Sequence, residues 1–392
     1  MQDKTIIVND FIYLLSCALN GKRIEISQAN KMNLDDIFSL ADYHKLASCA
    51  SFSFDDELLK EDSFKSWKQA KSMAVRKNIM LNNEREQIYS YMEENSIKHA
   101  SLKGIVMQNL YPKFGMREMG DNDILYDSAY QEQIHDYMIS HGYHAEVYKR
   151  FHHDEYLKPP IYNFEFHNSL FIRSKNEVFY NYYSDIMDRL LPVKGKNFEY
   201  RFSDEDFYIY NIAHSYQHYI SGGTGLRILT DCYVYLRAKS ESLDFIYIEN
   251  ECKKIGIYDY EQICRSISKK LFSVDNKSSN KLDCLDKDEK DILNRFISSG
   301  AYGKQEFAVE NKINELSKEG KSAFAIKTKY YFKRIFISLD TIRDEYPFFY
   351  KYKFLIPCLL IYRIIRILTF DRKRLKSELV SVDMTIENMK KK

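Results

Sequence analysis

Helical and strand-like spacings of apolar residues alternate through the first half of the chain. The pattern predicts a helix through residues 84–94 and a short strand over residues 98–102. Lys103-Gly104 then opens a second helix, which ends before Pro112. Another strand is predicted from Asp121 to Tyr126. This order of strand, turn, helix and strand indicates a mixed α+β unit.

Two carboxylates stand where the strand at residue 121 begins. Asp121 and Asp123 are two positions apart, so their side chains point to one side of the strand and Asn122 points to the other. Paired oxygen ligands of this kind hold Mg²⁺ in phosphoryl chemistry. The same Asp-x-Asp spacing also caps ordinary turns, so a metal site and a capped turn both fit the pattern.

The Lys103-Gly104 turn lies upstream of this acidic pair. A glycine between strand and helix lets the backbone approach a ligand closely, and the first amides of the helix favour an anion. Lys103 adds a positive charge. The alternative is a tight turn beside a solvated lysine, but the aspartates downstream favour phosphate binding.

Residues 162–167 alternate aromatic and polar side chains, as a strand with one buried face does. Glu165 and His167 fall on its polar face. A third carboxylate beside the acidic pair would complete an acidic trio, whereas the plainer interpretation is an ordinary surface glutamate. For His167, metal ligand, proton shuttle and hydrogen-bond donor all remain open.

The chain becomes mainly helical after residue 202. Ser203 is the predicted N-cap of a helix that carries His214 and His218 on one face. These imidazoles suit metal binding, but a structural or substrate-lining role is favoured. Residues 222–225 predict a flexible turn, and Arg227 and Asp231 on the next helix are spaced to pair with each other.

Taken in order, these motifs resemble the uncharacterised bacterial nucleotidyltransferase family of the polymerase-β superfamily. The resemblance covers most of residues 1–270 and includes helical lead-in segments at residues 11–21 and 40–44. It is carried by Leu102-Lys103-Gly104, Tyr111-Pro112, Arg117, Asp121-x-Asp123-Ile124-Leu125, Glu165-x-His167, His214, His218, Gly225-Leu226-Arg227 and Asp231.

The resemblance implies an α+β fold with a polymerase-β-like core, in which helices flank a mixed sheet. It also implies that Asp121, Asp123 and Glu165 are catalytic and bind the metal. Phosphate and substrate positions then fall at Lys103, Gly104, Arg117, His167, His214, His218 and Arg227. One departure is that the superfamily's Gly-Ser pair shortly before the acidic residues is missing, and Lys103-Gly104 stands further upstream.

The activity implied is transfer of a nucleoside monophosphate from a nucleoside triphosphate to a hydroxyl acceptor, with release of pyrophosphate. The acceptor is a small molecule, a sugar or a protein, and the cofactor is Mg²⁺ or Mn²⁺. Two alternatives stay open: a nucleotide-binding module without turnover, and a membrane-surface scaffold in envelope polysaccharide assembly.

Composition limits the remaining classes. The 392 residues include 58 basic and 56 acidic side chains, so no overall positive charge indicates nucleic-acid binding. Length and patterning divide the chain into an N-terminal helical region (1–95), a nucleotidyltransferase core (96–202), a helical domain that completes the cleft (203–272) and a C-terminal helical region (273–392).

Cysteine spacing and the N-terminal segment bear on location. Seven scattered cysteines without a C-x-x-C pair argue against a zinc site or a disulfide framework. The first residues lack a basic stretch followed by a long apolar run, so a cytoplasmic location is expected.

The C-terminal region contains a predicted exposed loop at residues 276–280 and an apolar-basic segment at residues 351–376. Its charge-free run, 354–362, is much shorter than the roughly 20 residues that span a bilayer. One interpretation is an interfacial helix that makes peripheral contact with anionic lipid at the inner face of the membrane. The other, which is favoured, is a buried helix whose arginines reach the surface.

Overall fold

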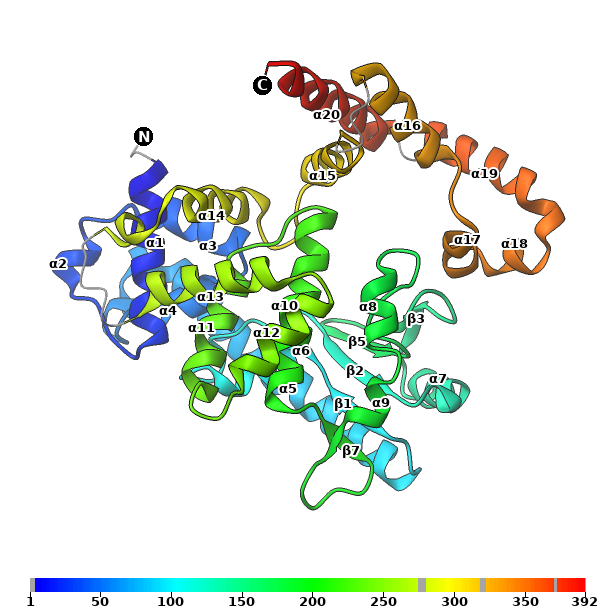
Figure 1. The fold of residues 1–392 in the computed structure, drawn as a ribbon. Coiled ribbons are helices and arrows are strands. Elements are labelled where there is room, and N and C mark those ends of the chain that lie inside the picture. The colour runs from blue at the N-terminus through cyan, green and yellow to red at the C-terminus, as the bar shows by residue number, and fades with distance from the viewer. Residues whose placement is uncertain (1–3, 274–279, 318–321, 370–371, 392) are drawn as a thin grey trace.

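The protein contains a seven-stranded mixed sheet flanked by helices, as a computed structural model shows (Figure 1). The structure describes residues 4–273, 280–317, 322–369 and 372–391. The α+β class expected from the sequence is therefore confirmed at this level. Most of the predicted loop at 276–280 lies outside the described residues.

The strands follow the order β3-β4-β5-β2-β1-β7-β6 across the sheet. Strand β2 pairs in parallel with β5 and antiparallel with β1, and β1 pairs in parallel with β7. The remaining neighbours are antiparallel. The bounds are β1 His99–Ser101, β2 Asn122–Tyr126, β3 His144–Val147, β4 His153–Lys158, β5 Tyr162–His167, β6 Leu191–Pro192 and β7 Glu199–Arg201.

Helices precede the sheet, interrupt it and follow it along the chain. The predicted helix at 84–94 is the end of the much longer α5. The described helices up to residue 272 are α1 Lys4–Leu19, α2 Ile26–Ala29, α3 Leu34–Tyr43, α4 Ala47–Ser51, α5 Lys65–Glu94, α6 Lys103–Met107, α7 Gln131–Ser140, α8 Glu177–Tyr182, α9 Ile186–Arg189, α10 Asp204–Ser221, α11 Arg227–Lys239, α12 Phe245–Lys254 and α13 Tyr258–Phe272.

The side chains of alternate residues in β2 pack into two different hydrophobic cores. Leu125 belongs to the main core, which joins the N-terminal helices to α10, α11, α13 and α14 (Lys287–Ser299). Ile124 belongs to a second core between α5 and the opposite face of the sheet. Asn122 shares that second face and is fully buried there, where it accepts a hydrogen bond from Arg85. The side predicted to face away from the aspartates is thus covered by α5.

The structure tests two of the local predictions, the N-cap at Ser203 and the flexible turn at 222–225. The Ser203 side chain accepts a hydrogen bond from the Asp206 N–H, which confirms the N-cap of α10. The turn at 222–225 was expected to be flexible, but its glycines are closely packed. A Cβ on Gly223 would lie 2.1 Å from Ser299 Oγ, and one on Gly225 would lie 2.9 Å from the Gly300 carbonyl oxygen.

The C-terminal helices extend from the body beyond α15, as Figure 1 shows. Helices α15, α16 and α20 share a small core that contains Ile313, Tyr330 and Val382. No described helix is both long and apolar enough to cross a bilayer. The bounds are α15 Gln305–Ser317, α16 Ala323–Ile335, α17 Leu339–Glu345, α18 Pro347–Lys351, α19 Ile356–Thr369 and α20 Arg372–Lys391.

The favoured interpretation of the segment 351–376 as a buried helix with surface arginines is wrong. In α19, Arg363 is only 9% exposed, whereas Ile361 is 60% exposed. The guanidinium of Arg363 donates to the Arg334 carbonyl oxygen at 3.1 Å, so α16 covers the side of the helix that carries Arg363. Arg366 does reach the surface as expected. The sequence pattern identifies two faces of a helix but does not show which face is covered.

Candidate active site

One cavity of about 480 Å³ lies between the β1–α6 turn, strands β2 and β5, and helices α10 and α11. Strand alternation and the helical spacing of four bring side chains from all these elements to its wall. Every site residue predicted from the sequence lines it. They are Lys103, Gly104, Arg117, Asp121, Asp123, Glu165, His167, His214, His218 and Arg227.

Asp123 and Glu165 lie side by side because the parallel register of β2 and β5 pairs them directly. His167 Nε2 lies 2.9 Å from Asp123 Oδ1 and 3.3 Å from Glu165 Oε2. Lys103 Nζ approaches the same Asp123 oxygen at 2.7 Å. Burial alone would raise the pKa of Asp123, but Lys103 and His167 outweigh it and hold this pKa well below its usual range. Asp123 is therefore ionised at neutral pH.

Asp121 borders the cavity just before β2 begins. Burial and the neighbouring negative charge of Asp123 raise the pKa of Asp121 to about 6. Within the described residues, Asp121 makes no ion pair or hydrogen bond through its carboxylate. A cation that enters the cavity would therefore stabilise the ionised form of Asp121.

The donor set fits a divalent cation. Asp123, Glu165 and His167 each offer one ligand atom, and these atoms lie within 4.8 Å of one another. Asp121 lies beside this group in the same cavity and is not one of its three members. Carboxylate oxygens suit Mg²⁺ and Mn²⁺, whereas imidazole nitrogen suits zinc, iron, copper or nickel ions.

His152 and His153 were not predicted, yet they also line the cavity. Antiparallel pairing of β4 with β5 sets His153 opposite His167, and the rings of His152 and His167 are 5.3 Å apart. Burial, with a smaller contribution from His167, lowers the pKa of His153 to about 4 and that of His152 further. Each of the three has a buried Nδ1 atom without a hydrogen-bond partner in the described structure. The sequence does show two adjacent histidines at 152 and 153. It does not show the strand register that brings them next to His167, so their place in the cavity could not be predicted.

Lys103 and Gly104 form the turn that predicted phosphate binding. Lys103 has a φ of +42°, which is uncommon for a residue other than glycine and strains the backbone at the start of α6. A Cβ on Gly104 would lie 2.5 Å from Arg117 Nη1 and 2.8 Å from Met119 Sδ. The lack of a side chain on Gly104 therefore lets Arg117 pack against the turn. This packing is a second reason for a glycine here, besides the close approach of a ligand that the sequence predicted.

The expected pairing of Arg227 with Asp231 is wrong, because Asp231 instead binds Arg117 through two contacts of 2.9 and 3.0 Å. Tyr111 also donates to Asp231 at 2.7 Å. Arg227 forms no ion pair within the described residues and borders the cavity. Helical spacing made the local pair plausible, but a buried partner from another element takes its place.

His214 and His218 lie on one face of α10, and their Nε2 atoms are 3.3 Å apart. Burial, assisted by the positive charge of Lys103, lowers the pKa of His214 well below its usual range, and the pKa of the more exposed His218 is lowered in the same direction. Both rings are neutral at pH 7. They suit hydrogen bonding to a substrate better than binding of its negative charges.

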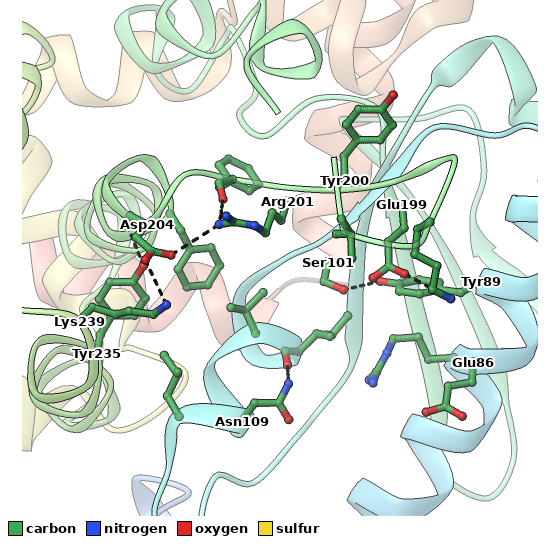
Figure 2. A pocket seen from close by; sticks show the side chains of 18 of the residues that line it. Glu86, Tyr89, Ser101, Asn109, Glu199, Tyr200, Arg201, Asp204, Tyr235 and Lys239 are labelled. Carbon is green, nitrogen blue, oxygen red and sulfur yellow. Dashed lines mark hydrogen bonds and ion pairs between the residues drawn. The ribbon is translucent and has the colours of Figure 1, made fainter. Parts of the chain in front are cut away.

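A larger cavity of about 700 Å³ is lined by residues of α5, β1 and β7, among them Tyr89, Ser101 and Tyr200 (Figure 2). Its charged side chains largely neutralise one another: Lys239 lies 3.0 Å and Arg201 3.7 Å from Asp204, and Lys196 lies 3.8 Å from Glu199. In the smaller cavity, by contrast, Asp121 and Arg227 have no such partners within the described chain. The smaller cavity is therefore the candidate active site.

Comparison with protein families assigns most of this region. A family model described as an uncharacterised nucleotidyltransferase matches residues 30–273, more than half of the chain. That span contains the whole sheet and all ten predicted site residues. No significant match is found among curated proteins or solved structures.

Proposed function

The chain belongs to the family of uncharacterised nucleotidyltransferases, and we propose that it transfers a nucleoside monophosphate from a nucleoside triphosphate to an acceptor hydroxyl, releasing pyrophosphate. One observation carries the proposal. Asp123 and Glu165 are neighbours on parallel strands, and Asp121 and the unpaired Arg227 share their cavity. The proposal is supported because acidic groups suited to a cation and a basic group suited to phosphate line the same cavity.

Asp121, Asp123 and Glu165 would hold Mg²⁺ or Mn²⁺, with His167 beside them. When bound, such an ion neutralises phosphate charge and lowers the pKa of a hydroxyl group. His167 contacts both Asp123 and Glu165, so it fixes the relative orientation of the two carboxylates. The low pKa of Asp123 keeps this ligand in its charged form over the physiological range.

Lys103 and Arg227 are the basic groups that we assign to the triphosphate. Phosphoryl transfer depends mainly on positioning the phosphates and on stabilising their negative charge. Two positively charged side chains on the cavity wall can do both. Arg117 was predicted to contact phosphate, but Asp231 engages its Nε and Nη2 donors. We therefore assign Arg117 to positioning the Lys103-Gly104 turn.

We assign Glu165 to the acceptor side of the cavity. Its one hydrogen-bonding partner in the described structure is His167 at 3.3 Å, whereas Asp123 is held by both Lys103 and His167. Glu165 is thus the more available carboxylate to accept the proton that leaves the attacking hydroxyl. In-line attack of that hydroxyl on the α-phosphorus forms one P–O bond and breaks the bond to pyrophosphate.

Label transfer tests the proposal. Purified protein is incubated with each α-³²P-labelled nucleoside triphosphate, Mg²⁺ or Mn²⁺ and a cell extract, and labelled acceptors are separated from free nucleotide. Asp123→Asn and Glu165→Gln should each lower transfer by about 100-fold or more. Glu155→Gln is the matched control, because Glu155 pairs with Glu165 across β4 and β5 but does not line the cavity.

Full activity of Asp123→Asn would exclude the proposed chemistry. Nucleotide binding by the wild-type protein without labelled product under any of these conditions would instead indicate a module that binds nucleotide but does not turn it over.

A further inference from the structure

The helices from α16 to α19, residues 323–369, form a projecting segment that we call the C-terminal arm (Figure 1). Large apolar side chains are exposed along it. Phe354 is 78% and Ile361 is 60% exposed. The exposed set also contains Phe332, Phe336, Leu339, Phe348, Tyr362, Ile364 and Ile365. Clusters of this kind on a protein surface mark contacts with another protein or with a membrane.

The apolar side of α19 is an organised face. Ile361, Ile364 and Ile365 follow the i, i+3, i+4 spacing and all point to solvent. On the opposite side, Leu359 is fully buried and Arg363 donates to the carbonyl oxygen of Arg334. The exposed side of α19 is mainly apolar, and Arg366 is the charged side chain exposed along with the isoleucines.

Basic side chains lie close in sequence to the exposed apolar face of α19. Residues 346–370 contain no aspartate or glutamate, and their exposed basic side chains are Lys351, Lys353 and Arg366. Arg363 lies on the covered side and does not add to this charge. Two of the three acidic side chains of α17 are engaged elsewhere: Asp340 pairs with Arg343, and Asp344 accepts from the Ser174 backbone N–H. Glu345 is the third, and three exposed basic side chains outnumber it. The surface around the exposed aromatics is therefore cationic.

We propose that the C-terminal arm docks on the surface of an anionic lipid bilayer. Apolar side chains beside lysines, with tyrosine and phenylalanine at the boundary, are the combination that binds in the headgroup region. Since no described helix can span a bilayer, the arm lies on the surface. A second copy of the chain is a poorer occupant, because Lys351 and Lys353 of each copy would face like charges.

Docking would place the candidate active site next to the membrane. Asp344 in α17 accepts hydrogen bonds from the backbone N–H groups of Phe151 and Ser174, through its carbonyl and its side chain at 3.4 and 3.3 Å. The residues that follow these two, His152 and Lys175, line the active-site cavity. The inference itself does not depend on nucleotide transfer.

Vesicle co-sedimentation of the full chain tests the proposal. Vesicles of equal parts phosphatidylcholine and phosphatidylglycerol should pellet the protein, and pure phosphatidylcholine vesicles should bind it at least about tenfold more weakly. Phe354→Glu with Ile361→Glu should lower binding to the anionic vesicles by about tenfold or more. Lys351→Gln with Lys353→Gln, which leaves the apolar face intact, should lower it by a similar factor.

Ile246→Glu is the matched control, because Ile246 is 76% exposed on α12 and lies outside the arm. It should bind vesicles as the wild type does. Equal binding to neutral and anionic vesicles, or undiminished binding by both arm variants, would overturn the proposal. Dimerisation of the wild type in light scattering that is lost in Phe354→Glu, without vesicle binding, would overturn it in favour of a second copy as occupant.

Discussion

Arg117 and Asp231 join the two sides of the candidate active site through a two-point ion pair. Arg117 Nε lies 2.9 Å from Asp231 Oδ1, and Nη2 lies 3.0 Å from Oδ2. The two residues are 114 positions apart; Arg117 lies on the loop before β2 and Asp231 on α11. Such bidentate geometry fixes orientation as well as distance. The relative position of the β1–α6 turn and α11 therefore depends on this contact.

Removing one member of the pair should destabilise the protein strongly. Asp231→Asn leaves the Arg117 guanidinium buried without its counter-charge, a change that costs about 3 to 5 kcal/mol. Urea unfolding followed by circular dichroism measures the loss. The double variant Arg117→Met with Asp231→Leu should lose less than either single variant, because no buried charge is left unpaired. Losses that simply add would show that the two side chains act independently.

Gly104→Ala tests whether the turn needs a glycine for packing. Alanine normally stabilises a helix by about 1 kcal/mol relative to glycine. Here its Cβ would come within 2.5 Å of Arg117 Nη1, and the ion pair with Asp231 keeps that group from moving away. We expect a net loss of about 1 to 3 kcal/mol in unfolding free energy. Gly120→Ala is the control, because nothing lies within 4 Å of its added Cβ, and it should be nearly neutral.

Local patterns in the sequence predicted the elements that hold the site. The alternation of aromatic and polar residues predicted strand β5 at Tyr162–His167, with Glu165 on the face that lines the cavity. Ser203, as an N-cap residue, predicted the start of α10. These features are properties of neighbouring residues, so a sequence contains them directly.

Contacts between distant segments could not be read in the same way. The partner of Asp231 is 114 residues away, and helical spacing pointed to Arg227 instead. His153 acquires its place from the pairing of β4 with β5, which no local pattern specifies. For α19, an amphipathic pattern left both the buried and the interfacial arrangement open, and only the contact of Arg363 with α16 showed which face is covered.

Lys103→Met should separate metal affinity from transfer activity. The Lys103 ammonium group lies 2.7 Å from Asp123 Oδ1, where it opposes the approach of any other cation to that oxygen. Removing this charge should therefore tighten Mn²⁺ binding, by about tenfold. Transfer should fall at the same time, because a group assigned to phosphate is lost. Electron paramagnetic resonance titration of free Mn²⁺ measures the affinity, with the exposed Lys113→Met as control. Unchanged or weaker Mn²⁺ binding by Lys103→Met would contradict this account.

His44 should make the stability of the fold depend on pH. The ring is fully buried, and its Nδ1 accepts a hydrogen bond from the Leu226 N–H at 3.3 Å, which requires the neutral form. Burial lowers the pKa of His44 from 6.5 to about 4. Between these two values the unfolded chain binds a proton that the folded chain does not, so folding weakens as pH falls through this window, by on the order of 3 kcal/mol. His44→Gln cannot bind that proton. Its unfolding free energy, measured in urea from pH 7.5 to 4.5, should be lower than that of the wild type at pH 7.5 and should decline less on acidification. Parallel declines of the two proteins would assign the acid sensitivity to other groups.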